Sequence, residues 1–317
     1  MSVLSRLPEP VFQRLAIIGC GLIGSSVAHA ARASGAAGEI VVHDASPEAR
    51  ARIVELGFAD RVEADAQAAV RGADLVVLAT PPAALGPAAQ TVASALQPGA
   101  VLTDVGSVKG AVAEAMIAAA PAGIHVIPGH PIAGTERSGP DAGFAELFHN
   151  RWTVLCPRPS DDPAYADAVA RLTAFWEALG ANVELMDEKH HDLVLAVTSH
   201  LPHLIAYNIV GTAADFEEVA EGEVMKYSAG GFRDFTRIAA SDPVMWRDVF
   251  LLNKDAVLEI LGRFTEDLQA LSRAIRWGEG DKLQALFTRT REIRRGVIAA
   301  GQESAEPNFG RDRPREG

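Results

Sequence analysis

The segment PGHPIAGTERSG, residues 128–139, contains a histidine whose surroundings suit acid–base chemistry. His130 stands between a glycine and a proline, at the end of an apolar run that predicts a strand. Such a histidine could bond only to backbone, bind a metal, or take a proton near neutral pH. No acid or cysteine stands at a ligand-like spacing from it, which argues against a metal. Its place at a strand end, downstream of a glycine-rich turn, favours the role of a base.

A second polar segment, TDVGSVKG, places Ser107 at the end of another predicted strand, with Lys109 just after it. Ligands of open α/β sheets bind beyond the carboxyl ends of the strands. We therefore expect Ser107 and His130 to face one site. An enzyme that oxidises an alcohol with a nicotinamide cofactor needs a group that takes the hydroxyl proton as hydride leaves, and His130 meets that need.

The second half of the chain carries two further polar segments. SHLPH places His200 and His203 three residues apart, on one face of a helix, where they could be a zinc pair without an evident third ligand or simply core residues. GGFRDFTRIAASDPVMWRD, residues 230–248, brings Arg237 and Trp246 together with other charges. Arginine suits a bidentate grip on a carboxylate, whereas solvated ion pairs are the plain alternative. The interleaved glycines and tryptophan favour a shaped loop.

The glycine-rich turn IIGCGLIGSS has the G-x-G-x-x-G spacing of a dinucleotide site, between a predicted strand and a predicted helix. Asp44 ends the next strand, twenty residues after the third glycine, where a carboxylate binds ribose hydroxyls and repels a 2′-phosphate. This favours NAD, with NADP as the alternative because Arg50 and Arg52 lie nearby. A flavin is disfavoured, since the later segments that usually embrace one are missing. The expected cofactor-binding residues are Gly19, Gly21, Leu22, Ile23, Gly24, Asp44 and Thr80.

The elements that position these residues alternate in the first half of the chain. Apolar runs predict strands buried on both faces of a parallel sheet, over residues 14–19, 39–44, 73–80, 100–107, 123–130, 151–157 and 182–186. Helices are predicted between them, over residues 22–35, 47–56, 83–96, 108–119 and 164–180. The fold class is therefore α/β, a Rossmann-type doubly wound parallel sheet, followed by an all-α C-terminal domain for substrate binding and dimerisation. We place the domains at 1–187 and 188–301, with 302–317 as a disordered tail.

After residue 187 the pattern is helical. A helix is expected to begin at the Asp187 cap and to kink at Pro202. A later helix, residues 254–276, carries a heptad-type apolar seam that could pack within the domain or serve a dimer. The seam consists of Val257, Leu261, Phe264, Leu268, Leu271 and Ile275.

Composition narrows the class of protein. The 317 residues are 48% hydrophobic and 22% charged, with a net charge of −12. Such an acidic surface disfavours nucleic acid and anionic membranes, so an anionic ligand would need a local basic pocket. Two cysteines, the lack of a signal-peptide pattern and the lack of an apolar run of about 18 residues predict a cytoplasmic protein.

The glycine turn, DVGSVKG, GHPIAGTERSG, HHDLVLAVTSHLPH and GGFRDFTRIAASDPVMWRD together resemble the motifs of the prephenate/arogenate (cyclohexadienyl) dehydrogenases of tyrosine biosynthesis, in order and spacing. The resemblance implies a Rossmann domain joined to a helical dimerisation domain. It also implies NAD(P)-dependent oxidative decarboxylation, either of prephenate to 4-hydroxyphenylpyruvate or of arogenate to tyrosine.

The resemblance also implies roles for individual residues. His130 would be the base that accepts the ring hydroxyl proton, and Ser107 would orient that hydroxyl. Arg237 would hold the ring carboxylate. The remaining expected substrate-binding residues are His200, His203, Glu136 and Trp246. Because no chorismate mutase segment and no regulatory ACT domain fit the chain, we expect a monofunctional enzyme.

Two other functions compete with this one. β-Hydroxyacid dehydrogenases share the architecture but use a helical lysine four residues before an asparagine, and here Leu204 stands four residues before Asn208. A non-catalytic NAD-sensing dimer would not need the histidine, serine and arginine. The sequence leaves prephenate and arogenate unresolved as substrates.

Overall fold

The structure is a computed structural model, and it describes residues 6–135, 137–217 and 230–299. The chain divides into two compact units, residues 1–258 and 259–317. The first unit holds the predicted chemistry, and the second holds most of a helical hairpin. The domain boundary expected at residue 187 stays a prediction, and the expected disordered tail lies outside the described residues.

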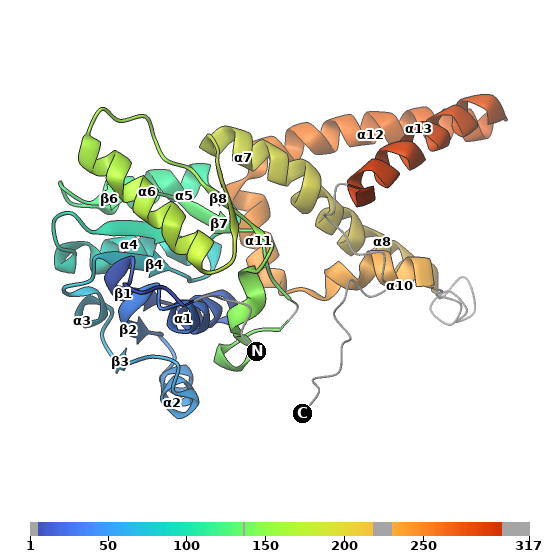
Figure 1. Cartoon of the computed structure of the whole chain (residues 1–317). Helices are drawn as coiled ribbons and strands as arrows, with labels where there is room; N and C mark the ends of the chain where they lie inside the picture. Colours follow the sequence, from blue (N-terminus) through green and yellow to red (C-terminus); the bar gives the residue numbers. More distant parts are fainter. Residues whose placement is uncertain (1–5, 136, 218–229, 300–317) are drawn as a thin grey trace. The chain divides into compact units, whose positions relative to one another are not determined.

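A six-stranded parallel sheet forms the centre of the first unit, in the order β3-β2-β1-β4-β5-β6 (Figure 1). The strand order reverses between β1 and β4, as in dinucleotide-binding folds, where ligands bind beyond the carboxyl ends of the strands. This confirms the predicted Rossmann-type sheet, although the short β3 was not predicted. The strands are β1 (Phe12–Ile18), β2 (Ala37–His43), β3 (Arg61–Glu63), β4 (Leu75–Leu78), β5 (Val101–Asp104) and β6 (His125–Val126).

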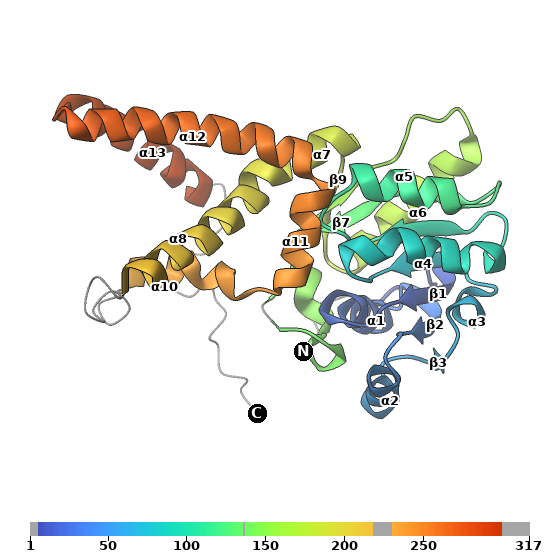
Figure 2. The same cartoon turned by 180° about the vertical axis from the view of Figure 1, so that it is seen from behind.

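Helices cover both faces of this sheet, and β1 shows why its apolar run is unbroken. Leu15 and Ile17 pack into a core with α1 and α6, whereas Ala16 and Ile18 pack into a second core with α3, α4 and α5. The views from the front and from behind show these two sets of helices on opposite sides (Figures 1 and 2). The helices are α1 (Leu22–Ser34), α2 (Pro47–Leu56), α3 (Ala66–Val70), α4 (Leu85–Val92), α5 (Gly110–Ala119) and α6 (Pro163–Ala178).

A second, three-stranded sheet corrects the sequence prediction. It consists of β7 (Gly129–Pro131), β8 (Trp152–Leu155) and β9 (Asn182–Leu185). β7 runs antiparallel to β8, and β8 runs parallel to β9. The strand predicted over 123–130 is therefore two strands in two sheets. The chain changes sheets at Pro128, which has no N–H to donate to a ladder. The expectation that 151–157 and 182–186 extend the parallel sheet is wrong.

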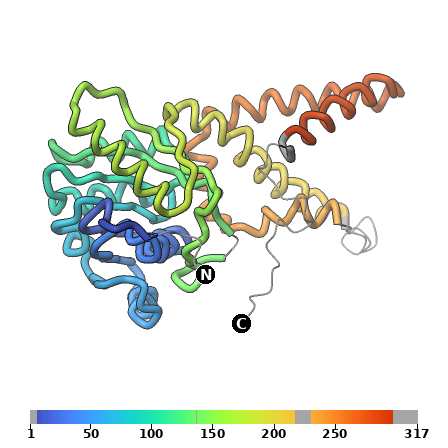
Figure 3. The backbone as a smooth tube through the Cα atoms, viewed as in Figure 1, coloured from blue at the N-terminus to red at the C-terminus, as the bar shows by residue number. Residues whose placement is uncertain are grey.

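Beyond β9 the described residues form helices and turns and no strand, which confirms the predicted all-α second half. The helices are α7 (Glu188–Leu195), α8 (Leu201–Glu217), α10 (Gly230–Thr236), α11 (Pro243–Leu252), α12 (Lys254–Arg276) and α13 (Gly280–Ala299), and the backbone tube follows them in order (Figure 3). α7 begins at the predicted cap, where the Asp187 side chain accepts hydrogen bonds from two backbone N–H groups. Between α7 and α8 lies a π-helical turn, Ala196–His200, directly before Pro202.

The helical stretch Glu188–Phe216 is long and apolar enough, by length and composition, to cross a membrane. The prediction that no segment reaches this length is therefore wrong. The stretch also carries buried polar residues, His191, Asp192 and His200. These bind other parts of the first unit, so one face of the helix belongs to the protein interior.

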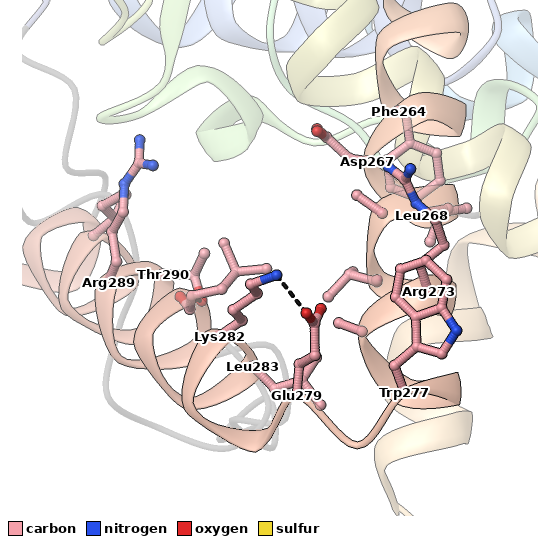
Figure 4. Close-up of a pocket in the computed structure, with 15 residues that line it drawn as sticks. Phe264, Asp267, Leu268, Arg273, Trp277, Glu279, Lys282, Leu283, Arg289 and Thr290 are labelled. Atoms are coloured by element: carbon pink, nitrogen blue, oxygen red, sulfur yellow. Dashed lines mark hydrogen bonds and ion pairs between the residues drawn. The ribbon is translucent and has the colours of Figure 1, made fainter.

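The second unit contains a groove of about 750 Å³ between α12 and α13. Phe264 and Leu268 of the predicted seam line it together with Leu271, and Figure 4 shows the first two on one wall. An ion pair between Lys282 and Glu279 lies near the turn between the helices (Figure 4). Ile275 and Trp277 are exposed by 68% and 67%. Exposed apolar surface of this kind marks a site of contact with another protein chain.

Candidate active site

The glycine turn between β1 and α1 contains two glycines that the fold requires and one that leaves room for a ligand. Gly19 has φ +95°, and a Cβ there would lie 2.7 Å from the Ala79 carbonyl oxygen. A Cβ on Gly24 would lie 2.0 Å from the Gly19 oxygen, whereas one on Gly21 would meet no atom within 4 Å. Gly19 and Gly24 are therefore required by the protein's own packing. Gly21 leaves open space beside the N-terminus of α1, where backbone N–H groups favour a phosphate.

Asp44 lies at the end of β2 with its carboxylate fixed over this turn. Its two oxygens accept hydrogen bonds from the backbone N–H groups of Cys20 and Ser46, each at 2.9 Å. The two nearby arginines are engaged elsewhere. Arg50 donates to the backbone oxygen of Asp44 at 2.6 Å, and Arg52 pairs with acidic side chains. The site thus has a carboxylate that can bind ribose hydroxyls, whereas Arg50 and Arg52 both bind protein groups.

A pocket of about 670 Å³ opens over the carboxyl ends of β1 and β4. Its walls include every predicted cofactor residue except Gly24: Gly19, Gly21, Leu22, Ile23, Asp44 and Thr80. The Thr80 hydroxyl is buried and has no hydrogen-bond partner among the described residues. Buried polar atoms are normally satisfied, so this hydroxyl points to a missing ligand. The open space at Gly21, the fixed Asp44 carboxylate and the unpaired Thr80 hydroxyl fit a dinucleotide. Ser107, half-exposed, lines the same pocket.

His130 lies on β7 and is only 7% exposed. Its Nδ1 is 2.9 Å from Nε2 of His191 on α7, and Nδ1 of His191 is 2.9 Å from Oδ1 of Asp192. A chain of two imidazoles and a carboxylate therefore runs inward from the predicted base. No role was predicted from the sequence for His191 or Asp192.

Asp192 is anchored to the start of α5. Its oxygens accept hydrogen bonds from the backbone N–H groups of Lys109, at 2.8 Å, and Gly110, at 2.9 Å. The fully buried Lys109 side chain pairs with Asp104 at the end of β5 and donates to the Gly129 carbonyl oxygen at 2.6 Å. These bonds fix β5, α5, β7 and α7 to one another. A charged residue at the end of an apolar strand, Asp104, was the one sequence signal of this network.

The histidines of this cluster are held in their neutral forms. Burial lowers the pKa of His130 well below its usual range, and the neighbouring His191 ring and the positive charge of Lys109 lower it further. Burial likewise lowers the pKa of His191, against the opposing hydrogen bond to Asp192. Burial lowers the pKa of His200 to about 4. At neutral pH, His130 is therefore an unprotonated imidazole that can accept a proton.

The other predicted substrate residues gather around Trp246 on α11. The His203 ring stacks on the indole with centroids 3.6 Å apart, and the His200 ring meets it edge-on at 6.0 Å. The positive charge of Arg237 contributes to the lowered pKa of His203, after burial and against a backbone hydrogen bond, so the two side chains are neighbours. Asn253 links this group to the relay, because its amide contacts both Nδ1 of His200, at 3.1 Å, and the Asp192 carbonyl oxygen, at 2.8 Å.

The structure thus brings most predicted site residues into one region of the first unit. The backbone of Ser107 lies close enough to the His200 ring to influence its pKa, and the His200 ring contacts Trp246. Glu136 lies outside the described residues. Asn253, Lys109 and the pair formed by His191 and Asp192 were missed as members of the site, because their contacts join segments far apart in the chain.

A pocket that fits a dinucleotide and a neutral, buried imidazole in the same unit supply what alcohol oxidation requires, a place for a hydride acceptor and a proton acceptor. The fold and the site therefore define a nicotinamide-dependent dehydrogenase. Residues 27–185 match the family model of the prephenate dehydrogenase nucleotide-binding domain, and residues 187–289 match that of the prephenate dehydrogenase dimerization domain. The chain belongs to the prephenate dehydrogenase family.

Individual relatives agree with this assignment. The chain is 44% identical to a cyclohexadienyl dehydrogenase of Zymomonas mobilis over 90% of this chain and 96% of the relative. It is similar to a structure of prephenate dehydrogenase from Aquifex aeolicus in complex with hydroxyphenyl propionate and NAD+, with 34% identity, a TM-score of 0.82, and coverage of 90% and 98%. It is also similar to arogenate dehydrogenase from Synechocystis, with 27% identity, a TM-score of 0.77, and coverage of 90% and 100%. The comparisons confirm the predicted family, dehydrogenase class and NAD cofactor.

Proposed function

We propose that this chain catalyses the NAD-dependent oxidative decarboxylation of prephenate, arogenate or both, in tyrosine biosynthesis. The observation that carries the proposal is the neutral His130 imidazole, held by a buried relay that is bound to Lys109, two residues after Ser107 in the wall of a pocket that fits a dinucleotide. The family and its characterised relatives support it. Prephenate would give 4-hydroxyphenylpyruvate, and arogenate would give tyrosine.

NAD would be held by the glycine turn, by Asp44 and by Thr80. Open space at Gly21 supports a pyrophosphate at the start of α1, and the Asp44 carboxylate supports a ribose with a free 2′-hydroxyl. When bound, NAD supplies the hydride acceptor. Because Arg50 and Arg52 are engaged with protein groups, no arginine near Asp44 favours a 2′-phosphate, so NAD is the preferred cofactor and NADP the poorer one.

His130 is the proposed base. It takes the proton from the C4 hydroxyl of the substrate ring while hydride leaves C4, and Ser107 in the adjoining pocket wall orients that hydroxyl. Departure of CO2 from C1 then returns an electron pair to the ring, which becomes aromatic. His130 can return its proton to the phenolic oxygen, so the step needs no further acid. The protein's tasks are positioning and the timing of proton removal.

The substrate is an anion, and the protein has a net charge of −12, so a local cation must attract it. Arg237, beside His203, is the proposed partner of the ring carboxylate. The stacked pair of His203 and Trp246 offers a flat surface at the side-chain end, with His200 behind it. Glu136 remains a predicted member of this pocket.

The chain is also proposed to work as a soluble, cytoplasmic homodimer. Residues 187–289 match a dimerization domain, and the second unit exposes apolar side chains beside the groove between α12 and α13. A second copy of the chain would cover this surface.

The experiment that tests the function compares kcat/KM for prephenate and arogenate with NAD and with NADP, by following formation of the reduced nucleotide. Turnover of at least one substrate, faster with NAD, is the expected result. No turnover of either substrate by protein that binds NAD would contradict the proposal and favour a cofactor-sensing role.

A further inference from the structure

We propose that His191 and Asp192 are positioning residues that fix the tautomer and the orientation of His130. The inference rests on the proposed role of His130 as the base. It gives a function to a pair of buried residues, and it explains how one particular nitrogen of His130 is kept free to accept a proton.

Asp192 determines where the proton of His191 sits. A carboxylate only accepts hydrogen bonds, and the two oxygens of Asp192 already face the backbone N–H groups of Lys109 and Gly110. The third group at this carboxylate is Nδ1 of His191, 2.9 Å from Oδ1. That nitrogen must therefore carry hydrogen. Burial lowers the pKa of His191, so the ring is neutral and its Nε2 bears a lone pair.

His191 in turn determines where the proton of His130 sits. Its Nε2 lone pair lies 2.9 Å from Nδ1 of His130, so the latter must donate. A neutral His130 with hydrogen on Nδ1 has its lone pair on Nε2. This is the tautomer that a base needs, since the proton then has one place to go.

The intervening imidazole also separates His130 from a full negative charge. A carboxylate bound directly to His130 would favour its protonated form and raise its pKa. With His191 between them, His130 stays neutral before the reaction. As the substrate O–H bond breaks and an N–H bond forms at Nε2, the new imidazolium donates from Nδ1 to His191. His191 already donates to Asp192, so the relay stabilises the positive charge where it forms.

The orientation of the relay is imposed by the fold. Asp192 is tied to the start of α5, and Asn253 donates to its backbone oxygen at 2.8 Å. Both His191 and His130 are buried and meet nearly edge-to-face, with an interplanar angle of 71°. The protein's own hydrogen bonds therefore hold the relay in this arrangement.

The test measures the tautomer directly and needs no activity. Protein labelled with ¹⁵N in its histidine rings is examined by NMR at neutral pH, and the His130 signals are assigned by their loss in His130→Asn. We expect hydrogen on Nδ1 and a free Nε2. Hydrogen on Nε2 of His130 in the unmodified protein would overturn the inference, whatever the enzyme's activity.

Two substitutions test the consequence for catalysis. In Asp192→Asn, the amide oxygen can take the place of Oδ1, which accepts from both Lys109 and His191, so the tautomer of His130 is kept while the negative charge of the relay is lost. We expect the NMR signals of His130 to keep hydrogen on Nδ1 and kcat to fall by about 10-fold or more, with little change in KM for NAD. A normal kcat in this variant would contradict the inference that the relay stabilises the imidazolium.

His191→Gln and His191→Phe form a matched pair. A glutamine oxygen can accept the hydrogen of His130 Nδ1, whereas phenylalanine leaves that hydrogen without a partner. His191→Gln should recover part of the kcat that His191→Phe loses, at similar KM for substrate. Equal losses in both would refute the positioning role. If His130→Asn itself keeps normal turnover, the proposed base fails while the tautomer measurement still stands, so the two failures are distinguishable.

Discussion

His130→Asn isolates the proposed base, because the side-chain amide of asparagine can still donate to Nε2 of His191 from near the position of Nδ1. The substitution removes only the outer nitrogen of the ring, and the buried relay behind it keeps its partner. The cofactor pocket does not include His130 among its walls. We therefore expect the affinity for NAD to be retained and kcat to fall.

The size of the loss follows from the role. A positioned general base contributes about 10²–10⁴-fold to rate. A kcat reduced by that factor corresponds to a barrier raised by about 2.7–5.5 kcal/mol. The lower end applies if water reaches the vacated space and serves as the base. The upper end applies if the buried site stays dry.

The assay follows NADH formation with saturating substrate, and NAD binding is measured separately by fluorescence titration. His125→Asn is the matched control, because His125 lies on β6, one strand before His130, and packs against Tyr165 instead of the relay. Its kcat should stay within about twofold of the unmodified protein. Near-normal kcat in His130→Asn would refute the base assignment.

The remaining predictions concern the cofactor, the carboxylate grip, the folded state and the assembly. Asp44→Ser should raise KM for NAD and reduce the preference for NAD over NADP. If the unmodified protein uses both cofactors equally, the role proposed for the Asp44 carboxylate is wrong. Arg237→Gln should raise KM for substrate by about 10–100-fold with kcat less affected, and an unchanged KM would place the ring carboxylate elsewhere. His200 has a folded-state pKa of about 4, below the unfolded value, so the unfolded chain binds more protons and stability falls as the pH drops below 6.5. At pH 5 this one group lowers the free energy of unfolding by about 2 kcal/mol. His200→Phe should reduce the difference in unfolding free energy between pH 7 and pH 5, measured by urea titration, by that amount. An unaltered difference would contradict the lowered pKa of His200. Ile275→Asp should yield monomers in light scattering, whereas the exposed control Gln269→Asp should not; two equal results would mean that the seam does not form the dimer.

The Rossmann-type half of the chain could be predicted from the sequence because the features that indicate it are local. Three glycines at fixed spacing, a carboxylate at the end of β2 and unbroken apolar runs each reflect a constraint within one or two neighbouring elements. Ser107 and His130 were predicted for the same reason, since a strand end is visible in the sequence. Ser107 follows β5 of the parallel sheet as expected, whereas His130 lies on β7 of the three-stranded sheet, so its predicted place at the end of a parallel-sheet strand was wrong. The roles of both residues stay predictions.

Features that depend on distant contacts were missed. Pro128 can interrupt a strand, but nothing local shows that the chain then pairs in another sheet with residues near 154. The relay joins residue 130 to residues 191 and 192, and its carboxylate is fixed by backbone groups more than 80 positions away. A histidine followed by an aspartate after a helix cap resembles an ordinary solvated helix start. Only packing shows that both side chains are buried.

In the proposed reaction, oxidation of the substrate ring is coupled to loss of its carboxylate. The most direct measurement is the ratio of NADH to CO2 released when the protein is supplied with NAD and either prephenate or arogenate. We expect equal amounts of NADH and CO2, with an aromatic product in the same amount. NADH without CO2, or neither product with either substrate, would contradict it.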